Sequence, residues 1–542
     1  MTRMLWRGAW IDVPAPHPVE ASVLLAVEAT VPLLPLGAVH GRDFGSPARK
    51  VASFVLTDGP LAAARKVRAK RAESGMTGDF HLVLAVGTSP AGERLVALVP
   101  RAPRCAQLLL AAPALTLPAP AELDPRGVAA ALLDRADELA PLVRQNYLYS
   151  GMEPPPELTD ALAAALASPR PGGVAVELLT PPPLGGEPAE TLTISPRAAT
   201  SARPPLAQLG AGDYVRIEVA PALADAEVER VVIADRQPQI AALAAAELGF
   251  AAATSNAEAA IDQLDRRGVV LVATAHDSHA ALAARALDAG HRVLLEKPAV
   301  VAPSDLDLLE AAATRNPGEL EVGFNRRHHP LVERAHELVA AEEGPATILA
   351  SIREVDITPD HWYLWPNQGT RVAGNLCHWI DLAFDLLGPE RAAVEVAVSP
   401  RVSADPGDAD AERAFTITFD DGSMVCLVPT TRGDSIRGVQ EQIEIRRGRL
   451  AIRLDDLWHL TGVRRGVPVR RRTVWRGKAH ERMYRRGLER FAAGQPAAYP
   501  LADVRRVAEV QLAATEAVRS GAPAGPVAEL LEAARERERR DG

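Results

Sequence analysis

The chain has 542 residues, enough for two or three domains, and 47 % of them are hydrophobic, so a large core can form. The formal net charge of -9 argues against a general nucleic-acid binder. The three cysteines are widely separated, and neither a signal-peptide core nor a long uncharged apolar run is present, which predicts a cytoplasmic protein without disulfides or membrane spans.

The first 168 residues carry no recognisable catalytic pattern. Apolar and β-branched runs predict strands there, and apolar residues at helical spacing among basic ones predict helices. The predicted strands are 21–31, 81–87 and 94–100, and the predicted helical stretches are 46–73 and 126–168. Residues 169–205 are rich in proline and glycine, with strand-like runs at 174–179 and 191–195, and we interpret them as a linker between domains.

A new pattern begins at Leu206, where a short strand runs into a turn with Gly210 and Gly212 and then into a helix. The next strand ends in Asp235, 23 residues after Gly212. Such glycines let a pyrophosphate approach the backbone at a helix N-terminus, and an acid after the second strand can bind ribose hydroxyls. Val215 replaces the third glycine of the usual fingerprint, so a plain strand-to-helix turn is the alternative to a dinucleotide site.

Strands and helices alternate up to residue 318, which predicts an α/β fold with a doubly wound parallel sheet over 206–318. Ligands bind such sheets at the carboxyl ends of the strands. A lysine near a reacting centre can donate a proton or stabilise an oxyanion. Two polar groups lie at such ends and should face one crevice: Thr274, His276 and His279, and Glu296, Lys297 and Pro298. For the histidines, a surface loop or a helix cap is the alternative.

Residues 319–522 predict an α+β domain, because strand-like segments, the first at 319–324, alternate with helices that suit one face of an open, mostly antiparallel sheet. In the helix predicted at 375–387, His378 and Asp381 are three residues apart and share a face. The carboxylate could orient the imidazole for proton transfer. The alternative is that Asp381 has a structural partner and His378 is a core residue.

Two charged stretches lie near the C-terminus. A basic run between Arg464 and Arg486 suits either an anionic substrate or a solvated strand and helix face. Residues 523–542 are predicted to form a charged, solvated helical tail.

Taken together, the motifs resemble the Gfo/Idh/MocA family (glucose–fructose oxidoreductase / inositol dehydrogenase) over about residues 205–520. The resemblance rests on the glycine turn, the polar loop after it, Glu296-Lys297-Pro298, Asn325-Arg326-Arg327, and the helix with His378 and Asp381. A closer likeness is to bi-domain oxidoreductases, in which such a module follows a degenerate alcohol dehydrogenase-like (GroES-like) part, here residues 1–168. The segments that carry this likeness are 58–70, 359–362 and 477–480.

The resemblance implies an NAD- or NADP-dependent oxidoreductase that moves a hydride between nicotinamide and a hydroxyl or ketone of a sugar or sugar derivative, nucleotide-linked sugars included. Asp235 favours NAD, whereas Arg236 could hold a 2′-phosphate. Many family members have an aspartate where Gly374 stands, so Lys297 and His378 would have to carry the proton. The implied residues are catalytic Lys297, His378 and Asp381; cofactor-binding Gly210, Gly212, Asp213, Tyr214, Asp235, Arg236, Thr274, His276, His279, Glu296, Lys297 and Pro298; and substrate-binding Asn325, Arg326, His361, Trp362 and Tyr363.

The likeness also implies that residues 1–200 bind no zinc and take no part in catalysis, since they lack the usual ligand signatures, and that they serve stability or oligomerisation. Family members often pair through the open sheet face, which implies a homo-oligomer acting on a small molecule, with no nucleic-acid or membrane partner. Two other functions remain open. One is a non-catalytic scaffold that kept the fold, and the other is NAD-assisted elimination or hydrolysis of a glycoside.

Overall fold

The computed structural model describes most of the chain from residue 80 onward and short stretches before it. The described residues are 2–6, 9–18, 22–35, 63–64, 80–103, 105–106, 108–142, 147, 149–150, 152–170, 174, 176–179, 190–195, 203–354, 357, 361–400, 412–433, 438–474 and 476–541. The helices predicted within 46–73 and the 58–70 motif lie almost entirely outside them. No helix in these ranges is long and apolar enough to cross a membrane.

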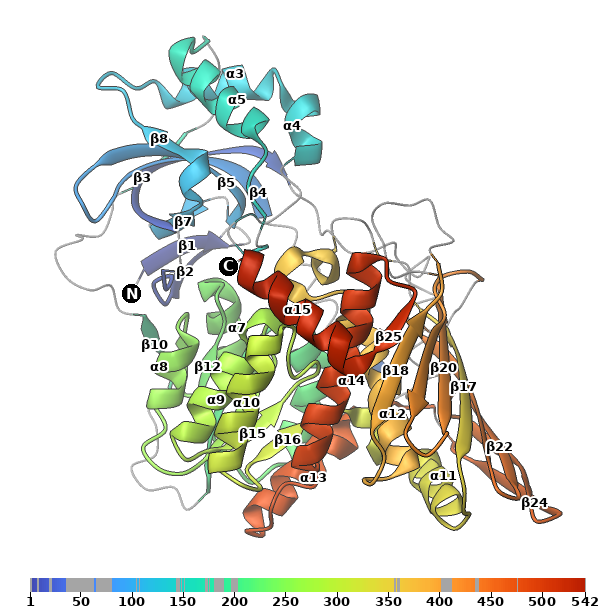
Figure 1. The fold of residues 1–542 in the computed structure, drawn as a ribbon. Helices are drawn as coiled ribbons and strands as arrows, with labels where there is room; N and C mark the ends of the chain where they lie inside the picture. Colours follow the sequence, from blue (N-terminus) through green and yellow to red (C-terminus); the bar gives the residue numbers. More distant parts are fainter. Residues whose placement is uncertain are drawn as a thin grey trace.

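The N-terminal part builds two antiparallel sheets, and helices pack against the larger one (Figure 1). Leu84 and Val96 of the larger sheet share a buried cluster with Leu158 and Leu162 of the last of these helices. The larger sheet has the order β7 (Leu108–Ala111), β3 (Val23–Pro35), β4 (Phe80–Thr88), β5 (Arg94–Pro103) and β8 (Thr116–Pro118). The helices are α3 (Pro125–Leu133), α4 (Ala136–Leu142) and α5 (Pro156–Ala167). The smaller sheet has the order β2 (Ala9–Val13), β1 (Thr2–Trp6) and β6 (Cys105–Ala106).

The second part is a twisted sheet whose strands run parallel except at one edge. Its order is β10 (Thr191–Thr193), β13 (Ala252–Thr254), β12 (Glu229–Ala234), β11 (Pro205–Leu209), β14 (Val269–Val272), β15 (Arg292–Leu295) and β16 (Leu320–Val322). The flanking helices are α7 (Pro238–Leu248), α8 (Ala257–Asp262), α9 (His279–Asp288) and α10 (Pro303–Arg315). Every residue of β11, β14 and β15 is buried, as expected for strands covered on both faces. The strand order reverses at β11, which confirms the predicted doubly wound sheet.

The third part is a large, mostly antiparallel sheet with helices on one face (Figure 1). Its order is β24 (Val467–Arg472), β23 (His459–Arg464), β22 (Leu450–Asp455), β21 (Gln440–Arg447), β17 (Ala346–Arg353), β20 (Met424–Thr430), β19 (Phe415–Phe419), β18 (Ala393–Val398) and β25 (Ala524–Pro526). Only β17 and β20 pair in parallel within the described residues. The helices are α11 (Pro330–Ala340), α12 (Cys377–Leu387) and α14 (Leu501–Ser520), and α14 also touches α10 of the parallel sheet.

One expected boundary was wrong. The segment predicted at 319–324 contributes β16 to the parallel sheet and not to the antiparallel one. Within the expected linker, the strand-like runs at 174–179 and 191–195 do contain strands, and these join the flanking sheets: β9 (Glu177–Leu178) pairs with β3, and β10 pairs with β13. Local sequence does not specify these partners, because edge pairing depends on which backbone groups are still unpaired.

The C-terminal tail is docked and is not a solvated extension. Its first residues form β25, and α15 (Val527–Asp541) packs along α14 (Figure 1). Arg537 pairs with Glu516 of α14 at 2.8 Å, and Arg535 pairs with Asp307 of α10 at 2.6 Å. The charges that suggested a solvated helix therefore join it to two neighbouring helices.

Candidate active site

The glycine turn after β11 is shaped for a close backbone approach. Gly210 has φ +87°, and a Cβ there would lie 2.1 Å from the carbonyl oxygen of Ala273, so only glycine fits. At Gly212 a Cβ would meet no atom within 4 Å, which leaves open space beside the helix that starts at Asp213. Val215 points into the core and is fully buried, so its side chain does not obstruct the turn. The turn fits a dinucleotide pyrophosphate at a helix N-terminus.

Asp235, at the end of β12, braces this turn. Its carboxylate accepts hydrogen bonds from the backbone N–H of Ala211 at 3.0 Å and of Gln237 at 2.9 Å, and burial raises its pKa. Each oxygen keeps a lone pair for a ribose hydroxyl. The guanidinium of Arg236 lies 4.3 Å from the ring centroid of Tyr149, a residue of the N-terminal part. Residues far apart in the sequence therefore meet where the adenosine ribose of a dinucleotide would lie.

The loop after β14 is held by hydrogen bonds to its neighbours. The backbone N–H of His276 donates to Gln368 Oε1 at 2.8 Å, and its Nδ1 lies 3.0 Å from the Gln368 carbonyl oxygen. His279 Nδ1 lies 2.7 Å from the carbonyl oxygen of Pro298, and the Thr274 hydroxyl accepts from Ser278 at 2.8 Å. Burial lowers the pKa of both histidines, which are therefore neutral parts of the site wall.

The Glu296-Lys297-Pro298 turn follows β15, and its lysine–proline peptide bond is cis. Glu296 accepts hydrogen bonds from the hydroxyls of Tyr214, at 2.8 Å, and Tyr484. Tyr214 lies on the first helix of the parallel sheet, and Tyr484 lies on α13 (His480–Ala492). Glu296 and Tyr214, both expected to bind cofactor, therefore hold the turn between two helices.

Lys297 projects toward the antiparallel sheet domain. Its Nζ donates to the carbonyl oxygen of Gly374 at 2.8 Å and lies 3.5 Å from the Tyr363 hydroxyl. Burial disfavours the charged ammonium, but the electrostatic interactions with Tyr363, Cys377 and Glu296 favour it more strongly. The pKa of Lys297 is therefore raised. A Cβ on Gly374 would lie 3.0 Å from the Tyr363 ring. The ring thus fills the space that a side chain at position 374 would need, and the backbone carbonyl of this position contacts the lysine.

His378, near the start of α12, is buried, and its Nδ1 has no hydrogen-bond partner in the described part of the chain. The imidazole lies edge-on to Phe324, with ring centroids 6.0 Å apart. Burial lowers its pKa well below the usual value, and the positive charges of Arg326 and Lys297 lower it further. His378 is therefore neutral at pH 7, with an imidazole that can exchange a proton beside a charged lysine.

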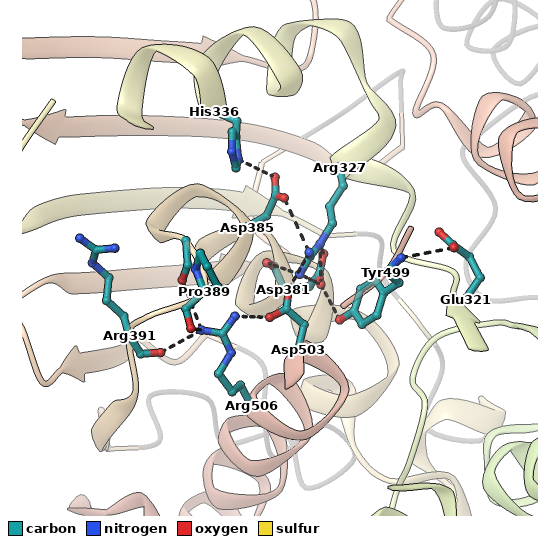
Figure 2. A network of polar contacts seen from close by, with 11 residues as sticks. Glu321, Arg327, His336, Asp381, Asp385, Pro389, Arg391, Tyr499, Asp503 and Arg506 are labelled. Atoms are coloured by element: carbon teal, nitrogen blue, oxygen red, sulfur yellow. Dashed lines mark hydrogen bonds and ion pairs between the residues drawn. The ribbon is translucent and has the colours of Figure 1, made fainter. Parts of the chain in front are cut away.

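The expected pairing of Asp381 with His378 is absent, and this prediction was wrong. Both carboxylate oxygens of Asp381 bind Arg327, at distances from 2.6 to 3.0 Å, and Oδ1 also accepts from the Tyr499 hydroxyl at 2.8 Å (Figure 2). Arg327 extends the network to Asp503 at 2.7 Å. A buried guanidinium must be paired, and Asp381 meets that need. The alternative, a structural Asp381, is correct.

The expected substrate wall divides into a buried floor and an aromatic side. Arg326 is 2 % exposed and pairs with Glu441 at 2.9 Å, so its charge is already compensated. Asn325 Nδ2 donates to the carbonyl oxygen of Lys478 at 2.6 Å, and its Oδ1 has no partner among the described atoms. The aromatic side packs around His276, with ring centroids 4.6 Å away for Trp362 and 5.4 Å away for Tyr363. His361 accepts from the backbone N–H of Tyr363 at 3.2 Å and orients this turn.

Sequence reasoning missed the residues that brace the site from a distance. They are Tyr149, Gln368, Tyr484 and Glu441. None lies within a motif, and each meets its partner only through tertiary packing. Lys478 was noted for its resemblance and as part of the basic run, for which an anionic-substrate site and a solvated face were the two interpretations.

Known proteins resemble the chain in this region. Residues 207–324 match the profile of the Gfo/Idh/MocA oxidoreductase family, described as having an NAD-binding Rossmann fold. Levoglucosan dehydrogenase of Pseudarthrobacter phenanthrenivorans is 33 % identical over 198 residues, which are 34 % of this chain and 49 % of that protein. Inositol 2-dehydrogenase of Rhizobium meliloti is 23 % identical over 253 residues, which are 46 % of this chain and 74 % of that protein. The chain therefore spans about half the length of the first of these relatives.

Solved structures show the same fold at low sequence identity. Levoglucosan dehydrogenase in complex with NADH and L-sorbose has a TM-score of 0.52 and 20 % identity, covering 60 % of this chain and 98 % of that one. GenD2 from gentamicin A biosynthesis in complex with NAD has a TM-score of 0.50 and 23 % identity, covering 61 % of this chain and 99 % of that one. The part of the chain outside these matches has no counterpart in either structure.

Proposed function

Through residues 207–324 this chain belongs to the Gfo/Idh/MocA family of oxidoreductases, and from this premise we propose that it transfers a hydride between NAD or NADP and a hydroxyl or ketone carbon of a sugar or sugar derivative. The observation that carries the proposal is that Lys297, at the carboxyl end of β15 in a dinucleotide-type sheet, donates to the carbonyl oxygen of Gly374, four residues before His378 on the adjoining helix. A charged donor next to a neutral imidazole suits proton exchange at one substrate oxygen.

The turn from Gly210 to Asp213 would hold the pyrophosphate, and Asp235 would accept a ribose hydroxyl. When bound, the nicotinamide supplies the carbon that exchanges the hydride. A 2′-phosphate would approach the carboxylate of Asp235, and the guanidinium of Arg236 is stacked on Tyr149. NAD is therefore the cofactor that these side chains suit better.

The chain's own residues supply positioning and charge. Lys297 donates a hydrogen bond to the reacting oxygen and stabilises negative charge there, because its ammonium is held by the Gly374 carbonyl in a buried site. His378 accepts the proton of an alcohol, or returns it to an alkoxide, through a neutral imidazole. Trp362 and Tyr363 offer aromatic faces to a sugar ring. Asp381 takes no direct part and anchors α12.

The test begins with fluorescence titrations of NADH and NADPH. Gly212→Asp places a carboxylate where the pyrophosphate would lie and should abolish binding, whereas Gly212→Ala should keep the fold because its Cβ meets no atom within 4 Å. Failure of the folded wild-type protein to bind either nucleotide would contradict the proposal and favour the scaffold.

The second step measures turnover on sugars. Loss of an oxyanion donor typically costs about 10²–10³ in kcat, so Lys297→Met should show a loss of that order, and His378→Gln should show a comparable one. The His378→Gln variant should bind NADH as the wild type does. Arg470→Gln, on the exposed strand β24, is the control. Full activity in both site variants would rule out this assignment.

A second candidate, glycoside elimination or hydrolysis with a retained cofactor, is favoured by one contact. Tyr149 stacks on Arg236 at the adenosine end and would hinder exchange of a bound dinucleotide. The two functions differ in a simple readout. A dehydrogenase releases NADH in proportion to product, whereas the elimination route leaves the bound nucleotide in place over many turnovers.

A further inference from the structure

We propose that Lys478 binds an anionic group of the substrate, so that the substrate is a sugar acid or a phosphorylated sugar and not a neutral one. This inference rests on the function proposed above and names its substrate class. It concerns residues 476–479, which directly precede α13 and include Lys478, a residue whose charge acts on His378.

The segment is fixed to the floor of the site. The carbonyl oxygen of Lys478 accepts from Asn325 Nδ2 at 2.6 Å. Ala479 has φ +65°, and α13 starts directly after it. Lys478 is close enough to His378 for its charge to lower the pKa of that imidazole, as Lys297 does. Two lysines therefore flank the proposed proton-exchanging group.

The other cations around Lys478 are already paired. Arg326 binds Glu441 at 2.9 Å, Arg476 binds Asp456 at 2.7 Å, and His480 lies 3.2 Å from Glu218. By contrast, the Lys478 ammonium has no carboxylate within 4.0 Å and no hydrogen-bond acceptor among the residues that the structure describes. The carboxylates of Glu441 and Glu218 act on Lys478 only at longer range, so its ammonium is a donor without a direct partner near His378.

An anion would stabilise such an ammonium more than a neutral ligand would. Lys478 is half-buried, and a partly desolvated charge without a direct partner is less stable than one that binds a group with several oxygen acceptors. Burial, with the charges of Arg476 and Arg326, lowers the pKa of Lys478 to about 7, which a bound anion would reverse. A carboxylate or a phosphate on the sugar has the required charge, whereas a neutral sugar would leave the ammonium unpaired.

The other residues of the basic run are not candidates for binding the anionic group of the substrate. Arg464 and Arg465 bind Glu342, and Arg482 binds Glu333. The strand residues 470–472 are exposed on β24. Most of the run is thus the solvated strand and helix face, and Lys478 is the member whose backbone is bonded to Asn325.

The test is isothermal titration of the full-length protein, with and without NADH, against D-glucuronate, D-glucose 6-phosphate and D-glucose. We expect at least one anionic sugar to bind more tightly than D-glucose, and Lys478→Met to weaken that binding about tenfold or more, as loss of an enclosed charge contact does. Lys478→Arg should retain most of the affinity, and D-glucose binding should not change. Arg470→Gln is the control, and the thermal midpoint of each variant confirms folding.

The outcomes distinguish a carboxylate from a phosphate as the anionic group. They also distinguish failure of the Lys478 inference from failure of the proposed oxidoreductase function. Preference for glucuronate indicates a carboxylate substrate, and preference for the phosphate ester indicates a phosphorylated one. The inference would be overturned if Lys478→Met bound the anionic sugars as tightly as the wild type, or if the wild type preferred D-glucose. In either case, NADH binding by the wild type would leave the proposed function intact. Absence of NADH binding would instead defeat the function itself.

Discussion

Gly374 contributes to the candidate site through its backbone alone. Its carbonyl accepts a hydrogen bond from Lys297, and the absence of a side chain makes room for the Tyr363 ring. A carbonyl gives the lysine an acceptor without a negative charge. In the proposed mechanism the proton would therefore be exchanged with His378, whose pKa burial lowers.

Introducing a side chain at position 374 should destabilise the fold. Overpacking costs about 1–3 kcal/mol, whereas replacing a helical glycine by alanine gains at most about 1 kcal/mol. Gly374→Ala should therefore lower the free energy of unfolding by about 1 kcal/mol, and Gly374→Asp by more. Combining either with Tyr363→Ala should recover much of the loss, because the ring causes the clash. Urea unfolding measures both, and additive losses in the double variants would contradict the explanation.

His329 should make stability depend on pH. Its Nδ1 accepts from the backbone N–H of Leu331 at 3.2 Å and caps α11, and burial lowers its pKa from 6.5 to about 4. Between these values the unfolded chain binds a proton there that the folded chain does not, so the wild type loses stability as the pH falls through this window. His329→Asn can cap without titrating.

Urea unfolding at pH 7 and pH 5 tests this prediction. The wild type should lose stability relative to His329→Asn on going to pH 5. His459→Asn, at an exposed position on β23, should show no such relative change. A parallel decline of the wild type and His329→Asn would assign the acid sensitivity to other groups.

At the scale of elements, periodic sequence patterns sufficed for the central sheet but not for its edges. Apolar runs alternating with helices predicted the buried strands β11, β14 and β15 correctly, because full burial on both faces leaves a strong signal. The strand β16 and the tail helix α15 were predicted as a strand and a helix, but their packing partners were wrong, since tertiary packing determines those partners. The same limit applied to Asp381, whose partners Arg327 and Tyr499 come from other elements.

The contact between Tyr149 and Arg236 predicts a kinetic effect on nucleotide exchange. A cation–π contact contributes about 0.5–2 kcal/mol, so its removal in Tyr149→Ala should speed NADH association and dissociation severalfold and up to about tenfold. Reduced nicotinamide mononucleotide, which lacks the adenosine half, should bind both proteins alike. Stopped-flow fluorescence gives the rates, with Tyr147→Ala as the control. Unchanged NADH rates in Tyr149→Ala would show that this contact does not obstruct the nucleotide site.

At the scale of the molecule, the described residues cover only one face of the large sheet. Its strands alternate between buried and exposed residues, as β17 does, and the exposed face carries Leu349, Met424 and Val428, each about 40 % exposed. These side chains lie on the neighbouring strands β17 and β20. An apolar group on an otherwise open face marks an interaction surface, and we expect a second copy of the chain to cover it.

The prediction is a homo-oligomer that a single charge can disrupt. A stable interface buries about 800 Å² on each partner, and an arginine at its centre would place an unpaired charge among apolar groups. Leu349→Arg should therefore lower the mass measured by size-exclusion chromatography with light scattering to that of the monomer. Leu308→Arg, equally exposed on α10, should not. If both variants keep the wild-type mass, assembly uses another surface, and if the wild type is itself monomeric, the open face has a different partner.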